Sequence, residues 1–417
     1  MDEPESGTTP ARPRPKGKPA SSRKGARPTK PKGNGEARAK KKKRKRYSPF
    51  MRLVRGLMLI LSIASVVALA ATAYAGNVSP LKYGGLWGIL PLCFPGCLCC
   101  YAALMALQVF WHWRGFVIMS AGMLACAGPA LDVCPLNVGF GERKAPEGAE
   151  TFTLLSYNIH NFWETRDSAD SRIPNRGLQY VLDSGADIVC LQEADAISVS
   201  RSLNITAEQL QRLHALYPYV IISGSAQAVL SKFPIEPIHL VVSRSEFDDA
   251  DLAAYRVTLP GGKIVSLFNV HLQSLALNEN DRQLYRKLTD LEKQDLTSVR
   301  VQLVEKLRHA NIERARQAQA LLRFIRHYGG PDVLICGDFN DVATCYTLRT
   351  LAGAGFKEVY PEVGFGPIIT YNSGRFYFGI DHVLYRGDFK PLSLTKGTLR
   401  ASDHYPLTVR FATGGGR

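Results

Sequence analysis

The chain has 417 residues and 46% of them are hydrophobic, so it can bury the core of one large domain or two ordinary ones. Its formal net charge is +16, but residues 1–46 carry 17 Lys and Arg against four acidic residues. The rest of the chain therefore has a net charge of only +3. This part has no basic stripe interleaved with aromatic residues, which argues against sequence-specific recognition of nucleic acid.

Residues 1–46 are rich in Pro, Gly, Ser, Lys and Arg and hold almost no large apolar side chains, so we predict a disordered tail. Seven consecutive basic residues run from Lys40 to Arg46. Nucleic-acid-binding arms and nuclear localisation signals contain such runs, but here an apolar stretch of membrane length follows. We therefore interpret the run as a juxtamembrane segment that keeps the N-terminus in the cytoplasm.

Residues 47–134 form an apolar region that we interpret as membrane-embedded. Its first run has 19 residues without a charge, and its second contains Pro91 and Pro95, which a spanning helix tolerates as kinks. We predict three transmembrane helices, at residues 57–75, 83–111 and 115–131. In the alternative, the second and third runs form a re-entrant or buried hairpin.

Basic residues set the orientation of these helices. If the stretch up to Arg55 is cytoplasmic, three crossings place Lys82 outside, Arg114 inside and the chain after the third helix outside. We therefore expect that part on the periplasmic or extracellular side. The lipid bilayer is a predicted partner, and no protein partner can be inferred.

Residues 135–150 have the composition of a linker, and from 151 to 413 strand patterns alternate with amphipathic helix patterns. The predicted strands cover residues 152–157, 188–191, 219–222, 228–231, 253–259, 264–272 and 333–336. The predicted helices cover residues 178–183, 207–216 and 303–327. We interpret the strongly charged stretch 278–300 as a solvated helical insertion without a functional site.

Polar residues gather where several of these apolar runs end. The run from Val333 to Cys336 breaks at Gly337, and Asp338 and Asn340 follow. On its own this segment is also consistent with an ordinary strand-to-loop turn. Further clusters occur along the chain: Ser156-Tyr157-Asn158-Ile159-His160, Cys190-Leu191-Gln192-Glu193, Asn269-Val270-His271-Leu272, and Gly379-Ile380-Asp381-His382 with Ser402-Asp403-His404-Tyr405-Pro406.

This ordered set resembles the endonuclease/exonuclease/phosphatase superfamily, the fold of deoxyribonuclease I, neutral sphingomyelinases and inositol polyphosphate 5-phosphatases. The resemblance covers residues 151–413. It implies an α/β fold, a four-layer sandwich of two packed mixed β-sheets flanked by helices, here preceded by transmembrane helices. It also implies hydrolysis of a phosphate ester, which requires a metal ion, a group that activates water and donors for developing charge.

The resemblance assigns the metal to Glu193, next to Gln192, with Asn158 beside it and Asp403 supporting it through water. Oxygen ligands of this kind suit Mg²⁺, and Mn²⁺ is the other candidate. Taken alone, Glu193 is also consistent with an acidic residue at a helix N-terminus. His160 stands where several nucleases of the family carry a metal-binding Asp, so the sequence favours one metal over two.

The resemblance assigns catalysis to five residues. Asp338 matches the Asp that orients the attacking water, and Asn340 matches an Asn that contacts the phosphate. His404 matches a general base or phosphate-contacting His, and Asp381 the carboxylate that orients it. His271 matches a His directed at the leaving oxygen or the phosphate. Taken alone, a His at a strand end is more often structural.

The chain also differs from the family pattern. Relatives often have Arg and Tyr beside the Asp that matches Asp381, whereas Gly379 and His382 stand there, so the local packing and phosphate contacts are in question. The segment from Thr370 to Asn372 resembles the Thr-aromatic loop at the rim of the family's substrate site.

The main hypothesis is therefore a membrane-anchored, Mg²⁺-dependent hydrolase of phosphate esters. Its substrate is open among a lipid head group, an inositol phosphate, a nucleotide and a nucleic acid. One alternative is a catalytically silent binding module of the same fold, and another is a nuclease acting on extracellular nucleic acid. A third is a membrane protein that binds nucleic acid through its basic tail.

Overall fold

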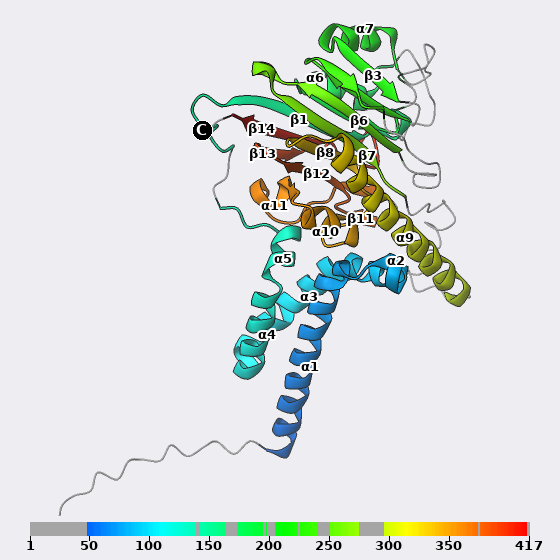
Figure 1. Cartoon of the computed structure of the whole chain (residues 1–417). Helices are drawn as coiled ribbons and strands as arrows, with labels where there is room; N and C mark the ends of the chain where they lie inside the picture. Colours follow the sequence, from blue (N-terminus) through cyan, green and yellow to red (C-terminus); the bar gives the residue numbers. More distant parts are fainter. Residues whose placement is uncertain are drawn as a thin grey trace, which may run out of the picture. The chain divides into compact units, whose positions relative to one another are not determined.

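The computed structural model describes residues 48–138, 142–162, 173–194, 197, 205–223, 226–239, 251–274, 296–373 and 376–414 (Figure 1). The predicted basic tail and most of the predicted charged insertion lie outside these residues. Residues from Phe50 to Arg417 form one compact unit, which holds both the apolar helices and the β-sheets.

Two six-stranded sheets form the centre of residues 150–414, in the strand orders β13-β14-β1-β2-β4-β3 and β5-β6-β7-β8-β12-β9. The strands of the first sheet are β1 Glu150–Asn158, β2 Ile188–Gln192, β3 Tyr219–Ser223, β4 Gln227–Ser231, β13 Lys390–Lys396 and β14 Leu407–Thr413. Those of the second are β5 Ile235–Pro237, β6 Asp251–Thr258, β7 Ile264–His271, β8 Val333–Asp338, β9 Lys357–Glu358 and β12 Asp381–Arg386. A small ribbon pairs β10 Tyr371–Ser373 with β11 Phe376–Phe378.

Helices cover the outer face of each sheet. The first sheet packs against α6 Arg176–Asp183 and α7 Ala207–Leu216, and the second against α9 Leu296–Tyr328 and α10 Tyr346–Gly353. A short α11 spans Val359–Val363. A third apolar layer fills the space between the sheets. The β1–β2 and β7–β8 pairs are parallel and their other neighbours antiparallel, so the expected four-layer sandwich of mixed sheets is confirmed.

The predicted strands are all present, but the last third of the fold differs from the prediction. The sequence pattern did not predict β12, β13 or β14, nor the short strands β5, β9, β10 and β11. In addition, α9 begins at Leu296 and not at residue 303, so it takes in the end of the charged stretch.

Two N-terminal helical segments, Pro49–Asn77 and Gly85–Trp111, are long and apolar enough to cross a membrane. They contain α1 Pro49–Tyr74 and α3 Leu90–Trp111. The third predicted span is instead a bent pair, α4 Trp113–Ala125 and α5 Ala127–Val133, with 68° between them. The described residues therefore offer two spans, or three if the bent pair crosses as one.

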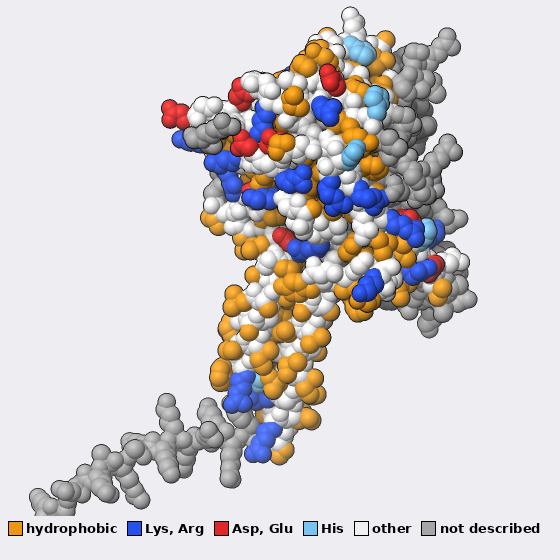
Figure 2. Space-filling model, viewed as in Figure 1, with side chains coloured by type: hydrophobic (Ala, Val, Ile, Leu, Met, Phe, Trp, Pro, Cys, Tyr) orange, Lys and Arg blue, Asp and Glu red, His pale blue; other side chains and the backbone are white. Residues whose placement is uncertain are grey.

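Polar contacts fix how these helices lie against one another. Gln108 of α3 donates a 2.9 Å hydrogen bond from Nε2 to Oγ of Ser62 in α1, and Gly115 of α4 lies against both side chains. Arg55 and Arg114 both lie near His112 at this end of the helices. Hydrophobic side chains cover the surface of these helices (Figure 2).

The other end of the helices contacts the sandwich through residues 75–89, which we call the connector. It contains η1 Ala75–Asn77, α2 Pro80–Tyr83 and η2 Gly85–Ile89. A Cβ atom on Gly76 would lie 2.0 Å from the carbonyl oxygen of Thr344, and one on Gly85 would lie 2.0 Å from that of Arg308 in α9. Only glycine permits this approach, so the connector packs backbone to backbone on the sandwich.

The Gly85 contact predicts that an added methyl group destabilises the protein at Gly85 but not at a glycine whose Cβ position has no neighbours. Gly85→Ala forces the connector away from α9 and is expected to destabilise the protein by about 1–3 kcal/mol, as overpacking does. Gly56→Ala in α1 is the control, because nothing lies within 4 Å of its Cβ position. Thermal unfolding of the full chain in detergent measures both. Equal unfolding temperatures for the two variants would contradict the close contact.

Candidate active site

The strands that carry the predicted site residues follow the two-residue alternation of a β-sheet. Alternate side chains of these strands point into the layer between the sheets, and the central ones are apolar, such as Cys190 in β2 and Cys336 in β8. At one end of each strand, the terminal position on this face is polar. These positions are Asn158, Gln192, His271, Asp338 and Asp381.

Strand register brings the polar positions side by side. Asn158 is paired with Gln192 in the first sheet, and Asp338 is paired with both His271 and Asp381 in the second. The two sheets meet here, because Asn158 Nδ2 donates a 3.1 Å hydrogen bond to Asp338 Oδ2. The site is thus the polar end of the layer between the sheets.

Gly337 permits the close approach of β8 to β7. Its φ is +142°, and a Cβ atom there would lie 1.9 Å from the carbonyl oxygen of Val270. No residue with a side chain fits this position, so the glycine before Asp338 is required by the packing of the parallel strand.

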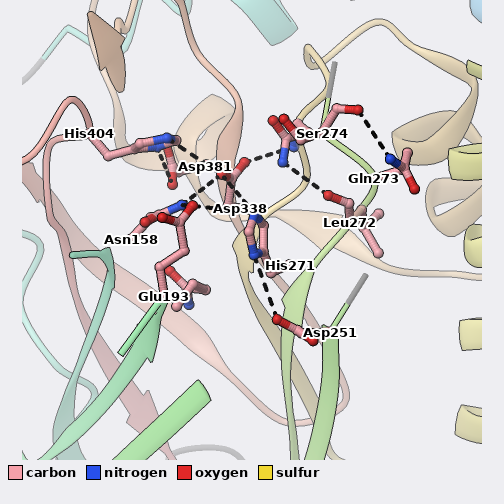
Figure 3. A network of polar contacts seen from close by, with 12 residues as sticks. Asn158, Glu193, Asp251, His271, Leu272, Gln273, Ser274, Asp338, Asp381 and His404 are labelled. Carbon is pink, nitrogen blue, oxygen red and sulfur yellow. Dashed lines mark hydrogen bonds and ion pairs between the residues drawn. The ribbon is translucent and has the colours of Figure 1, made fainter. Parts of the chain in front are cut away.

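A cavity of about 180 Å³ opens at this end of the sheets. Figure 3 shows the polar network on its floor, to which β1, β7, β8 and β12 each contribute a residue. The predicted residues that line the cavity are Glu193, His271, Asp338, Asn340, Asp403 and His404.

His404 lies between two carboxylates. Its Nδ1 is 2.9 Å from Asp381 Oδ2, and its Nε2 is 3.5 Å from Asp338 Oδ2. The position of Asp381 is itself fixed, because its backbone N–H donates a 3.0 Å hydrogen bond to Thr370 Oγ1. The ring of Tyr371 lies 4.9 Å from the imidazole, centroid to centroid. The imidazole is therefore fixed in one orientation.

Burial and charge act in opposite directions on His404. Burial lowers the pKa of the imidazole, but the carboxylates of Asp381 and Asp338 raise it by more, to about 10. Burial raises the pKa of Asp381, and the charge of His404 offsets only part of that effect. In the absence of a metal ion, His404 is therefore a cation at neutral pH and a proton donor.

A second group of polar residues surrounds Glu193. Asn158 Nδ2 donates to Glu193 Oε1 at 3.0 Å as well as to Asp338, and its Oδ1 accepts the backbone N–H of His160 at 3.1 Å. Glu193, Asn340 and His160 all have positive φ, between 50° and 52°. Strained backbone at the strand ends is typical of functional sites.

The donors around the cavity fit a hard divalent cation. Glu193, Asp338 and Asp403 are carboxylates that line it, and Mg²⁺ prefers such oxygen ligands. Asn158 turns its amide nitrogen toward two of these carboxylates, so it holds them in place. A compact group that could bind a metal is formed by Asp338, Asp381 and His404.

Two histidines of the cavity lie near carboxylates without hydrogen bonds to them. His271 Nε2 is 3.8 Å from Glu193 and 3.7 Å from Asp338, and its Nδ1 is 3.9 Å from Asp251. His160 Nδ1 is 3.9 Å from Asp403. The predicted residues are thus brought together at one cavity, and their individual roles stay predictions.

A family model described as "Endonuclease/Exonuclease/phosphatase family" matches residues 155–404. The chain belongs to this family. Solved structures of similar fold include family members from Beutenbergia cavernae DSM 12333 (18% identity, 63% of this chain and 72% of that chain, TM-score 0.42) and Bacteroides vulgatus (16%, 64% and 100%, 0.41). Truncated Caenorhabditis elegans TDP2 gives 18% identity over 63% of this chain and 97% of that chain, with a TM-score of 0.37. No curated protein matches the chain.

In this member of the endonuclease/exonuclease/phosphatase family, Arg314 of α9 is a charged residue of the site that the sequence did not predict. It lines the cavity and is 1% exposed. Its guanidinium lies 3.3 Å from Asp341 and donates to Gln273 O and to Asn311 Oδ1. A charged residue on the apolar face of the helix, four positions before Ala318, was the signal that could have revealed it.

His382, a departure from the family pattern, faces away from the cavity. It is buried on the other side of β12, where Nδ1 contacts Glu358 at 2.6 Å and Nε2 contacts the carbonyl oxygen of Asp341 at 2.8 Å. Both ring nitrogens have partners on that side, so the presence of His382 at this position leaves the contact between Asp381 and His404 in place.

The shifted pKa of His404 predicts how stability depends on pH. Because its pKa rises from the usual 6.5 to about 10 in the folded protein, the charged form stabilises the fold fully below pH 6.5 and loses that effect as the pH rises through about 10. In EDTA, the unfolding temperature of the parent protein should exceed that of His404→Gln at neutral pH. The difference should shrink above pH 10. A difference that is constant with pH would contradict the charged imidazole.

Proposed function

We propose that the protein is a metal-dependent hydrolase of phosphate esters, anchored in a membrane. The observation that carries the proposal is that His404 contacts both Asp381 and Asp338. At the same cavity, Asn158 of the other sheet hydrogen-bonds to both Asp338 and Glu193. This arrangement supplies a fixed proton donor, a proton acceptor and carboxylates that can bind a cation, which are the groups that attack of water on phosphorus requires.

In the proposed reaction, Asp338 accepts the proton of the attacking water. Its carboxylate is held as an acceptor by the backbone N–H of Asn340 at 2.8 Å and by Asn158. His404, as a cation, donates to a phosphoryl oxygen, and Asp381 keeps its Nδ1 bonded so that Nε2 faces the cavity. The oxygen of water bonds to phosphorus while the ester bond to the leaving oxygen breaks. His271 lies beside Glu193 and Asp338, where it can donate to that oxygen.

A bound Mg²⁺ or Mn²⁺ would neutralise the phosphoryl oxygens as charge develops. Glu193 would hold it, with Asp403 at the cavity wall and Asn158 orienting the carboxylate of Glu193. The sequence expectation of a silent binding module is less well supported, since each group that hydrolysis needs lines the same cavity.

The proposed membrane topology has the basic tail in the cytoplasm and residues 151–413 on the opposite side. Arg55 and Arg114 lie at one end of the helices, and the connector packs on the sandwich at the other. Under the positive-inside rule, this separation supports three crossings, with the bent α4–α5 pair as the third.

Metal dependence should reside in Glu193. Glu193→Gln keeps the size of the side chain and removes its charge, so we expect kcat/KM at low Mg²⁺ to fall by about 10- to 100-fold or more and to recover partly at high Mg²⁺. Hydrolysis of bis-p-nitrophenyl phosphate by the full chain measures this. Glu208→Gln, in α7, is the matched control. Activity of the parent protein that persists in EDTA would overturn the metal assignment.

The His404–Asp381 pair should behave as one unit. His404→Ala is expected to lower kcat by about 100- to 10,000-fold, the usual contribution of positioned proton transfer. Asp381→Asn should cost less if Asp381 only orients the imidazole. The double variant should be clearly less than additive. Full activity of His404→Ala, or additive losses, would exclude the proposed pairing.

Topology is tested by protease added to sealed spheroplasts. The domain after residue 150 should be digested, whereas an epitope at the N-terminus should be protected until detergent is added. Protection of the domain in sealed spheroplasts would exclude an odd number of crossings.

A further inference from the structure

The wall of the cavity includes a residue from the predicted membrane region. Leu92, in the first turn of α3, lines the cavity together with His404 and Asp338. It is half-buried and packs against the apolar cluster under the second sheet. The contacts of Gly85 with Arg308 and of Gly88 with Asn311 hold this turn in place. The site is therefore incomplete without the start of a membrane helix.

The length of α3 places Leu92 at the edge of the bilayer. A helix of 22 residues is about 33 Å long, close to the roughly 30 Å of a hydrocarbon core. If α3 crosses, its first turn lies at the boundary between hydrocarbon and head groups. Tyr83 and Trp87 of the connector are exposed just before it, as aromatic residues at that boundary commonly are.

The cavity is polar on its floor and apolar at one side. Phe376, Phe378 and Ile380 line the apolar side with Leu92, and the two phenylalanine rings lie 6.2 Å apart. Arg314 is the one Lys or Arg among the described lining residues, and Asp341, Gln273 and Asn311 already engage it. Among these described residues a polynucleotide finds no basic track for its backbone, whereas a phosphate joined to a hydrocarbon chain matches both sides of the cavity.

We propose that the substrate is a phospholipid of the bilayer. Its phosphate lies in the cavity against His404 and Asp338, and its hydrocarbon passes along Leu92 and Phe376 into the membrane. This inference rests on the proposed hydrolase function and adds its substrate class.

The test compares two phosphodiesters with the same leaving group, ethyl p-nitrophenyl phosphate and hexadecyl p-nitrophenyl phosphate. The full-length protein is reconstituted in phosphatidylcholine vesicles with Mg²⁺. The hexadecyl ester should have a kcat/KM at least about tenfold higher, a preference that burial of two methylene groups provides. Leu92→Gln and Phe376→Gln should lower kcat/KM for the hexadecyl ester more than for the ethyl ester, so that most of this preference is lost, because each replaces an apolar lining side chain with a polar one.

Leu86→Gln is the matched control, because Leu86 is an exposed connector residue outside the cavity lining, and it should keep the preference. If the preference arises only because the hexadecyl ester partitions into the vesicle that holds the protein, it stays intact in all three variants. That result would overturn the lipid site. Equal rates for the two esters, or faster cleavage of an oligonucleotide than of the hexadecyl ester, would also overturn it and leave the hydrolase standing. Failure to hydrolyse any of the three would instead refute the proposed function. If Leu92→Gln loses ethyl-ester activity through misfolding, Phe376→Gln decides, because Phe376 belongs to β11 and not to the packing of α3.

Discussion

A carboxylate buried where two sheets meet is the constraint on which the site depends. The side chain of Asp338 is 1% exposed, and a charge so placed is stable only with donors around it. Asn158 reaches it from the first sheet, the backbone of Asn340 from its own loop, and His404 from the loop before β14. These donors converge only when both sheets hold their register, so folding and assembly of the site are one event.

The same requirement accounts for the unusual backbone at the strand ends. Glu193 and Asn340 both leave their strands with positive φ, which costs roughly 1–3 kcal/mol each for residues other than glycine. Asn340 Nδ2 donates to Leu272 O at 2.9 Å, and Glu193 O accepts from Asn161 N at 2.7 Å. These bonds hold turns that aim the side chains at the cavity and not along the sheet.

The sequence predicted what depends on local pattern. Apolar runs that end in polar residues revealed β1, β2, β7 and β8, and the order of their polar ends indicated the family. The strand β12 was missed because its first two residues are polar although they are buried: Asp381 faces His404 and His382 faces Glu358. Partners distant in sequence make those positions suitable for a strand.

Two other features also depend on distant contacts. Arg314 lies on a long helix for which the sequence predicted no site residue, and its burial depends on the packing of the connector and of the loop after β8. Likewise, Leu92 read simply as part of an apolar span, since nothing local indicates that the first turn of α3 reaches the cavity. Composition identifies a membrane segment, but tertiary packing decides what that segment touches.

The backbone-to-backbone contact between connector and sandwich has a kinetic consequence. Because the glycine contacts leave no room for a flexible tether, the cavity stays at a constant height relative to the helices. With a bilayer substrate, such a protein meets its next molecule by lateral diffusion in two dimensions. Its turnover would then depend on the surface density of substrate in one leaflet and not on the bulk concentration, and diluting the vesicles at fixed composition would leave the rate per protein unchanged.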